Sequence, residues 1–223
     1  FAENEPNNSI TEANPISVNS TSNGHIGGGV YPNIDNQDWW VVTLTTQGSL
    51  TINTNSGSIV CVVSYLYLAD GATILTDTWS GPCSDTNRTM IVPNLAPGNY
   101  YIKATNYSGA GNYTISTTFT ASPYPSDIEP NKYMNQAVQV QPTDTAIGLL
   151  GYIGQSYQDD NDWYKITLVE DGSLTLRVLT NLTLTVNTLY LFDSDTNTII
   201  ASGNWGTDAT VNHPNLSPGS YYI

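Results

Sequence analysis

Carboxylates are crowded in front of aromatic residues at two places in this sequence. Residues 35–40 read DNQDWW, and residues 159–164 read DDNDWY. These acids stand out because charged residues make up only 11% of the chain. Grouped carboxylate oxygens can hold a hard cation such as Ca²⁺, which takes about six to eight oxygen ligands, or can act as the acid and base of glycoside hydrolysis. The same acids can also accept backbone hydrogen bonds at turns, which requires no ligand.

The two acidic stretches belong to an internal repeat. Four blocks recur in the same order, the first three at a spacing of 124 residues and the last at 121: EPNN and EPNK from Glu5 and Glu129, DWW and DWY from Asp38 and Asp162, GSLTI and GSLTL from Gly48 and Gly172, NLAPGNYYI and NLSPGSYYI from Asn94 and Asn215. Ordered repetition of this kind indicates two copies of one domain. We predict domains at residues 1–121 and 127–223, joined by a proline-containing linker at 122–126.

Each copy consists of short, strand-like runs separated by turn residues, without a sustained helical period. The strands expected in the first copy are residues 39–45, 49–53, 60–69, 73–77, 90–92, 99–105 and 113–119. This all-β pattern predicts two tandem antiparallel β-sandwich domains of the jelly-roll type. The second copy ends at Ile223, the counterpart of Ile102, so we expect it to lack its closing strand and the chain to be a fragment.

These blocks resemble the bacterial pre-peptidase C-terminal (PPC) domain family, whose pattern contains E-P-N-[ND], D-x-D-[WFY], L-x-P-G-x-Y-x-I and a final G-x-Y-x-[IVL] strand. The matching residues are 5–8, 36–39, 95–102 and 111–115 in the first copy, and 129–132, 160–163 and 216–223 in the second. The resemblance implies a jelly-roll-like sandwich that accompanies secreted bacterial hydrolases, often peptidases, as a non-catalytic module. The collagen-binding domains of clostridial collagenases are similar, and this implies calcium binding by the segment that leads into the sandwich.

The expected calcium sites combine that leading segment with the acidic loop. Alternate residues of an extended segment point the same way, so their oxygens can converge on one ion. The candidate ligands are Glu3, Glu5, Asn7, Asn8, Asp35 and Asp38 in the first copy, and Asp127, Glu129, Asn131, Asp159 and Asp162 in the second. The first six match the ligands of the collagen-binding relatives, with Asn8 standing where an acid is common. The second copy departs at Lys132, because an ammonium group cannot coordinate a cation.

Strand alternation separates the aromatic residues into inner and outer faces. A lysine in mid-strand, such as Lys165, is not expected to face the core, which places its outer-face neighbour Trp163 outside as well. The candidate platforms for stacking on a polymer are Trp39 with Tyr101, Trp163 with Tyr222, and Trp79 with Trp205 in matching glycine-containing loops. Outer aromatic residues also pair across strands for stability alone, and this alternative stays open.

The overall charge excludes some partners. The net charge is −14, with 19 acids against five bases, so no basic surface is available for nucleic acid. We find no apolar run of the length that spans a membrane, and we expect a monomer. Cys61 and Cys83 are expected to pair in an oxidising compartment, although two buried thiols are the alternative.

No motif of a known catalytic centre is present: the sequence contains no H-E-x-x-H, no G-x-S-x-G and no phosphate-binding glycine loop. We therefore expect no enzyme. The leading hypothesis is a non-catalytic, calcium-stabilised accessory module of a secreted or cell-surface bacterial hydrolase, which binds an extracellular polymer, either polysaccharide or collagen-like protein. The alternative is a structural spacer or adhesin segment that binds calcium but no polymer.

Overall fold

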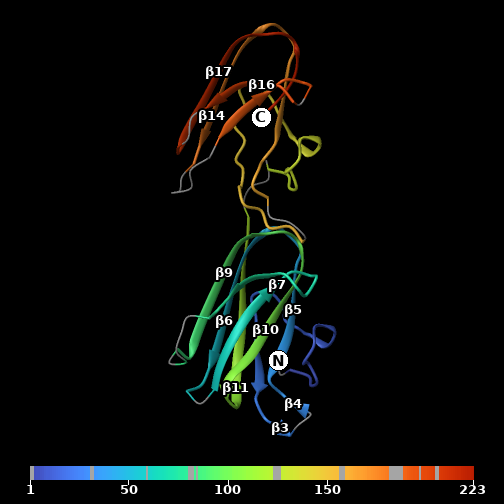
Figure 1. The fold of residues 1–223 in the computed structure, drawn as a ribbon, viewed down its shortest axis with the longest axis vertical. Helices are drawn as coiled ribbons and strands as arrows, with labels where there is room; N and C mark the ends of the chain where they lie inside the picture. The colour runs from blue at the N-terminus through green and yellow to red at the C-terminus, as the bar shows by residue number, and fades with distance from the viewer. Residues whose placement is uncertain are drawn as a thin grey trace. The chain divides into compact units, whose positions relative to one another are not determined.

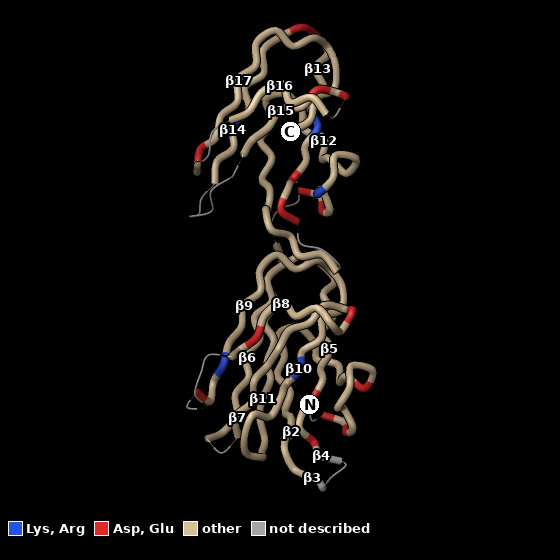
Figure 2. Tube along the Cα trace, in the orientation of Figure 1, with Lys and Arg blue, Asp and Glu red and all other residues tan. Residues whose placement is uncertain are grey.

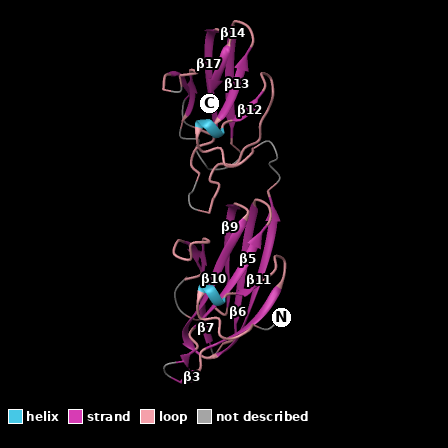
Figure 3. Cartoon of the chain, turned by 90° about the vertical axis from the view of Figure 1, so that its right-hand side faces the viewer, coloured by secondary structure: helices cyan, strands magenta, loops and turns pink. Residues whose placement is uncertain are grey.

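The structure is a computed structural model that describes residues 3–30, 33–58, 60–79, 83, 85–122, 127–155, 159–180, 188–195, 197–203 and 206–223. It consists of β-strands with two short 3-10 helices in this described part (Figure 3). The chain divides into two compact units, one of residues 1–123 and 152–158, the other of residues 124–151 and 159–223. The predicted fold class, all-β with β-sandwich domains, is confirmed. None of the described helices has the length and hydrophobicity that a membrane crossing requires.

In the described residues, the first unit contains one 3-10 helix and eleven strands. Their bounds are η1 (Ile10–Glu12), β1 (Asn14–Pro15), β2 (Thr21–Ile26), β3 (Gly29–Val30), β4 (Asn33–Ile34), β5 (Gln37–Leu44), β6 (Gly48–Ser56), β7 (Val60–Tyr67), β8 (Ile74–Asp77), β9 (Asn87–Leu95), β10 (Gly98–Gly109) and β11 (Gly111–Ala121). One sheet has the order β1-β5-β10-β7-β8 and the other the order β2-β11-β6-β9, and β3 and β4 form a small separate hairpin (Figure 1).

The two sheets of the first unit enclose one hydrophobic core. On β5 the inner residues Trp40, Val42 and Leu44 are at most 2% exposed, and they face a layer that includes Leu50 and Ile52 of β6. This inward alternation is the pattern that identified the strand in the sequence. Burial of each such side chain contributes about 1.5–3 kcal/mol, which is why the strand register is well defined.

All seven strands predicted for the first copy are present, with bounds that differ by a few residues. Strand β2 was not predicted, because its inward positions include Ser22 and Gly24 and so give no apolar alternation. Gly24 is required there by close packing, since a side chain would collide with the ring of Tyr113 on β11. Strand β2 is therefore held by its neighbour in the sheet, which sequence periodicity cannot reveal.

The second unit repeats this plan with fewer strands. Its elements are η2 (Met134–Gln136), β12 (Val138–Val140), β13 (Tyr164–Leu168), β14 (Gly172–Leu179), β15 (Leu189–Phe192), β16 (Ile199–Gly203), β17 (Asp208–Leu216) and β18 (Gly219–Tyr222). Strands β12-β13-β18-β15-β16 form one sheet and β14-β17 the other. Residues Ile166, Leu191, Val211 and Tyr221 lie in the core between them.

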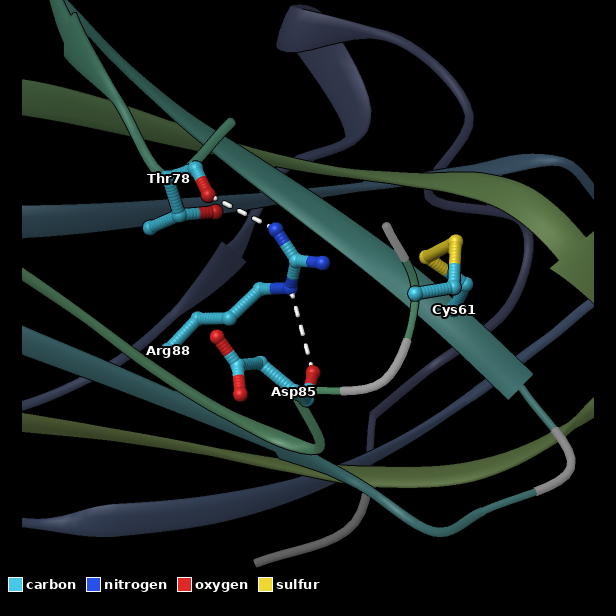
Figure 4. Close-up of a disulfide and its surroundings, with 5 residues drawn as sticks. Cys61, Thr78, Asp85 and Arg88 are labelled. Carbon is cyan, nitrogen blue, oxygen red and sulfur yellow. Dashed lines mark hydrogen bonds between the residues drawn. A yellow bond between two sulfur atoms is a disulfide. The ribbon is translucent and has the colours of Figure 1, made fainter. Parts of the chain in front are cut away.

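The predicted disulfide is confirmed. Cys61 on β7 is bonded to Cys83, with their Cα atoms 5.5 Å apart (Figure 4). The same connection is held by the buried guanidinium of Arg88, whose Nη1 donates to the Thr78 carbonyl at 2.8 Å and whose Nε donates to the Asp85 carbonyl at 3.3 Å. The chain between β8 and β9 is therefore attached to the sandwich by a covalent bond and by a buried cation.

Removal of the disulfide should destabilise the first unit. For the double variant Cys61→Ser, Cys83→Ser we expect a loss of about 3 kcal/mol in the free energy of unfolding, because the closed loop restricts the unfolded chain. Urea unfolding with and without reductant measures the effect. Reductant should lower the midpoint of the parent chain to that of the double variant and leave the variant unchanged. A parent midpoint that is insensitive to complete reduction would contradict the expectation.

Candidate metal centres

The leading segment of the first unit, residues 3–8, is held against the start of β5 by backbone contacts. The Trp39 N–H donates to the Asn7 carbonyl at 2.9 Å, and the Gln37 side chain donates to the Asn8 carbonyl at 2.5 Å. The Asn7 side chain, fully buried, donates to Glu3 Oε2 at 3.3 Å. These contacts bring the acids of the leading segment to the loop that carries Asp35 and Asp38.

Four oxygens from the predicted ligand set of the first unit are buried without a hydrogen-bond partner among the described residues: Asn7 Oδ1, Asn8 Oδ1, Asp35 Oδ1 and Asp38 Oδ1. One carboxylate oxygen from each of Glu3, Glu5 and Asp38 also lies within 4.8 Å of the other two. Figure 2 shows acidic segments near the N-terminus and near β4 and β5. An unpaired buried acceptor costs about 1–3 kcal/mol, so each of these oxygens favours an electropositive partner.

The second unit has the same arrangement between residues 127–132, its own leading segment, and residues 159–162. Glu129 Oε1, Asn131 Oδ1, Asp159 Oδ2 and Asp162 Oδ1 are buried and unpartnered within the described chain. Single carboxylate oxygens of Glu129, Asp159 and Asp162 lie within 4.8 Å of one another. The Asn131 side chain donates to Asp127 Oδ1 at 2.7 Å.

Several contacts that build the two clusters correspond along the repeat. The Asn131 N–H donates to Glu129 Oε2 at 3.1 Å, as the Asn7 N–H does to Glu5 Oε2 at 3.1 Å. Likewise the Trp163 N–H donates to the Asn131 carbonyl at 2.9 Å, the counterpart of the contact at Trp39. Two sequences that differ at many positions therefore keep oxygen-bearing side chains at most of the candidate positions, with Lys132 in place of Asn8 as the exception.

Burial and mutual repulsion disfavour negative charge in the first cluster. Burial raises the pKa of Asp38 to about 9; the Tyr113 hydroxyl opposes this shift, and the charges of Glu3, Asp35 and Glu5 add to it. Burial also raises the pKa of Glu3, Glu5 and Asp35. Opposite charge is scarce here: His25 Nδ1 lies 3.9 Å from Asp35 Oδ2, which is an ion pair only when the imidazole is protonated.

The second cluster shows the same effect with one added cation. Burial raises the pKa of Glu129 to about 8, with a contribution from Asp127, and raises the pKa of Asp162 to about 7. Burial also raises the pKa of Asp159, while the nearby charge of Lys132 lowers it. Lys132 therefore lies close enough to the cluster to interact with Asp159.

Asp38 is tied to the core by a network that the sequence did not reveal. The Tyr113 hydroxyl on β11 donates to Asp38 Oδ2 at 2.7 Å and accepts from Trp40 Nε1 at 2.8 Å. In the second unit Tyr164, the counterpart of Trp40, donates instead to Asp127 Oδ1 at 3.0 Å. Tyr113 lies 75 residues from Asp38 in the chain, so only the pairing of strands could identify it.

The donor set determines which metal these clusters suit. Every candidate ligand atom is an oxygen of a carboxylate or an amide, and the described residues offer no cysteine or histidine among them. Oxygen-only sets with several carboxylates suit Ca²⁺ or Mg²⁺ and not Zn²⁺ or Cu²⁺, which favour nitrogen and sulfur. The residues present therefore fit a hard divalent cation.

The outer aromatic residues are less exposed than the sequence suggested. Trp39 is on the outer face as expected, but only 8% of it is exposed, because its ring reaches across β10 to Tyr67 of β7, at 5.1 Å between centroids. Lys103 Nζ lies 5.7 Å from the same ring. The ring contact described for Trp39 is with Tyr67 and not with Tyr101, because the strand register places Lys103 opposite Trp39 and Tyr101 opposite Val41.

In the second unit, Trp163 likewise contacts Phe192, at 5.0 Å between centroids, instead of Tyr222. The outer residues Tyr222 and Lys165 lie side by side, with Lys165 Nζ 5.8 Å from the Tyr222 ring. Trp205, the expected partner of Trp79, lies outside the described residues.

Trp79 is the most exposed of the predicted aromatic residues that the structure describes. It is 49% exposed and contacts Tyr107, which is 62% exposed, at 4.8 Å between ring centroids. The two rings line an open groove of about 440 Å³, whose remaining lining residues are Val63, Tyr65, Asp77 and Thr105. The hydroxyl of Thr105 is buried and has no partner in the described part of the chain. Tyr107 was not among the candidate ligand-binding residues, because it lies beyond residues 99–105, the strand that the sequence predicted.

Comparison with known proteins gives weak likenesses. The sequence matches no model of a known protein family and no curated protein. The pre-peptidase C-terminal domain of a collagenase from Bacillus anthracis is similar at 21% identity and a TM-score of 0.41, over 52% of this chain and 100% of that one. A cycloisomaltooligosaccharide glucanotransferase from a Paenibacillus species, complexed with cycloisomaltoheptaose, is similar at 11% identity and a TM-score of 0.25, over 91% of this chain and 44% of that one. Similarity at this level carries no argument about function.

The raised pKa values of the acids predict how the metal-free protein responds to pH. Asp38, Glu129 and Asp162 have folded-state pKa values of about 9, 8 and 7, above the value near 4 of an unfolded chain. The folded state therefore holds protons that the unfolded state releases, and its stability should fall as pH rises from about 5 to about 9. Urea unfolding of the chelator-treated chain across this window measures the slope. Stability that increases with pH would contradict the expectation.

Proposed function

We propose that this chain is a non-catalytic, calcium-stabilised binding module with one Ca²⁺ site in each unit. The observation that carries the proposal is the set of buried, unpartnered oxygens, four in each cluster, contributed by a leading segment and an acidic loop. In each unit a cation could also lie between three carboxylates whose oxygens are within 4.8 Å of one another. It would also neutralise carboxylates that otherwise repel one another.

Calcium is the best candidate among hard cations because of the irregular ligand set. Mg²⁺ demands near-ideal octahedral geometry and keeps several waters, whereas Ca²⁺ tolerates variable numbers of protein oxygens. The acids here come from flexible side chains on two separate segments, and amide oxygens of Asn7 and Asn131 complete them. In the second unit Lys132 adds a positive charge near Asp159, which should weaken the second site relative to the first.

The proposed role is attachment to an extracellular polymer, either polysaccharide or collagen-like protein. The groove with Trp79 and Tyr107 supports this proposal because two exposed aromatic rings, tilted by 59° to each other, offer apolar faces to sugar or proline rings. Asp77 and the unpartnered Thr105 hydroxyl, which line the same groove, add polar groups that a ligand can pair with. The partly covered faces around Trp39 and Trp163 are then secondary surfaces.

The proposed location is outside the cell, as part of a secreted or surface-bound hydrolase. The Cys61–Cys83 disulfide supports an oxidising compartment, where such bonds persist. The attachment to a hydrolase rests on the sequence motifs shared with pre-peptidase C-terminal domains. In such a protein the module would keep a catalytic domain near an insoluble substrate, and two linked units would raise the apparent affinity.

Calcium should stabilise the folded chain through both sites. At a concentration about 100 times the dissociation constant, we expect each occupied site to add about 2.7 kcal/mol to the stability of its unit, because only the folded state binds the ion. Calorimetric titration should give two ions per parent chain and one per chain for Asp38→Asn or Asp162→Asn, each of which removes a ligand charge.

The exposed neighbour Asp160 offers a matched control for the change in net charge. The Asp160→Asn variant should still bind two ions and keep the full calcium-induced rise in the unfolding midpoint. If calcium leaves the midpoint of the parent chain unchanged, the acidic clusters are turn-forming groups only, and the proposed metal sites are wrong.

Polymer binding should depend on the groove of the first unit. The double variant Trp79→Ala, Tyr107→Ala should bind insoluble polysaccharide or collagen about tenfold more weakly than the parent in calcium-containing buffer, since stacked aromatic residues dominate such contacts. Sedimentation with the polymer measures the bound fraction. Ile91→Ala, at a 66% exposed apolar residue on the opposite sheet, is the control and should bind as the parent does. A parent chain that binds calcium but none of the polymers would favour the spacer function instead.

A further inference from the structure

An open groove of about 380 Å³ lies in the second unit at the turn between β17 and β18. Its lining includes His213, Asn215, Leu216, Gly219 and Tyr221. The Nδ1 atom of His213 is buried there without a hydrogen-bond partner in the described chain. The groove therefore presents an unpaired imidazole nitrogen next to residues of the core of the second unit. It is separate from the metal cluster and from the aromatic groove.

The corresponding turn of the first unit is covered by a peptide segment. Residues 152–155 belong to the first unit, and Ile153 forms a parallel bridge with Leu95. The Ile153 N–H donates to the Asn94 carbonyl at 2.8 Å, and the Ala96 N–H donates to the Ile153 carbonyl at 2.9 Å. Through these two hydrogen bonds, Ile153 pairs with the turn in the way that a residue of a neighbouring parallel strand would.

Side chains on both sides of that bridge fix the position of the segment. Ile153 packs against the core of the first unit, and Tyr152 is only 6% exposed. Gln155 lies directly over Gly98, where a side chain would collide with its amide group. Gly98 is therefore needed to admit the segment. This docking combines main-chain hydrogen bonds with side-chain packing, as in strand addition to a sheet edge.

The groove of the second unit keeps the features that accept this segment. The repeat places Asn215, Leu216, Ser217 and Gly219 at the positions of Asn94, Leu95, Ala96 and Gly98. Asn94 and Asn215 both have a left-handed backbone, with φ of 61° and 56°. The Tyr221 hydroxyl donates to the Ser217 carbonyl at 2.8 Å, as the Tyr100 hydroxyl does to the Ala96 carbonyl at 2.8 Å. The two turns therefore share a left-handed asparagine and the same hydrogen bond from a tyrosine hydroxyl to a carbonyl. They differ at the glycine, because Gly98 has a φ of 146° whereas Gly219 is not among the glycines with positive φ.

We propose that the groove of the second unit is a docking site for a further copy of this repeat, which would insert an extended segment like Tyr152–Gln155. An isoleucine at the centre would pair its N–H and carbonyl with Asn215 and Ser217, and a residue with a long polar side chain would lie over Gly219. The inserted segment would thereby cover the turn of the second unit as residues 152–155 cover the turn of the first. This docking is independent of calcium and of polymer binding.

A peptide with the sequence of residues 148–155, acetylated and amidated, tests the site on the full chain. In ¹⁵N-resolved NMR titrations we expect chemical-shift changes concentrated at residues 215–219. A peptide with aspartate in place of isoleucine at the position of Ile153 should bind at least about tenfold more weakly, because it lacks the apolar side chain and brings a carboxylate into a groove that already contains Asp193. Changes spread evenly over the surface, or confined to residues 94–98, would overturn the proposal.

The Gly219→Ala variant tests whether a loss of peptide binding comes from a blocked groove or from a change in the fold. An added methyl group at Gly219 would make only ordinary contact with Tyr221, whereas the equivalent group at Gly98 would collide with the docked Gln155. The variant should therefore fold as the parent does, shown by unchanged shifts elsewhere, and should lose peptide binding. Gly172→Ala, where a methyl group meets nothing within 4 Å, is the matched control and should bind normally. Undiminished binding by a folded Gly219→Ala variant would refute the docking geometry.

Discussion

The arrangement of each unit depends on one electrostatic constraint, the meeting of buried carboxylate and amide oxygens where the leading segment crosses the first long strand. Asn7 illustrates it: its carbonyl accepts from the Trp39 N–H, its side-chain nitrogen donates to Glu3, and its side-chain oxygen remains buried and unpaired. Backbone pairing thus forces the oxygen into a position that is unfavourable without a positive partner. A bound cation would pair with this oxygen, remove the free-energy cost of its burial, and hold the leading segment to the sandwich.

Buried carboxylate and amide oxygens meet in both units, although some of the residues that supply or orient them differ. The repeat therefore preserves the arrangement of the oxygens more than the identity of the residues. Glu3 of the first unit is replaced by Asp127, yet both accept a hydrogen bond from a backbone N–H, that of His25 in one case and Leu149 in the other. The support of the carboxylates differs more. Asp38 is held by Tyr113 of the last strand of its unit, whereas in the second unit a tyrosine hydroxyl on the first long strand bonds Asp127. The positions of the oxygens are therefore more constant than the residues that orient them.

Much of this could be predicted from sequence because it depends on short-range periodicity. The alternation at Trp40, Val42 and Leu44 identifies both the strand and its inner face, and the repeat spacing predicts two copies of one domain. Alternate acids in the leading segment also indicate which side chains converge. The remaining features depend on strand order: Trp39 is covered by Tyr67 from two strands away, and Tyr113 reaches Asp38 from a distant part of the chain. No local pattern contains that information.

The loop that precedes the first long strand, residues 27–35 in the first unit and 151–159 in the second, has ends that are alike in the two units and a middle that differs. Its ends are matched, since the Gly27 N–H donates to the Asp35 carbonyl and the Gly151 N–H to the Asp159 carbonyl. Its middle differs: Gly29 belongs to the short β3–β4 hairpin, whereas Ile153 at the equivalent position pairs with Leu95. Glycine lacks the side chain that such docking needs. Because both ends are anchored next to the acidic cluster, the middle of the loop can change its partner without moving the ligand oxygens.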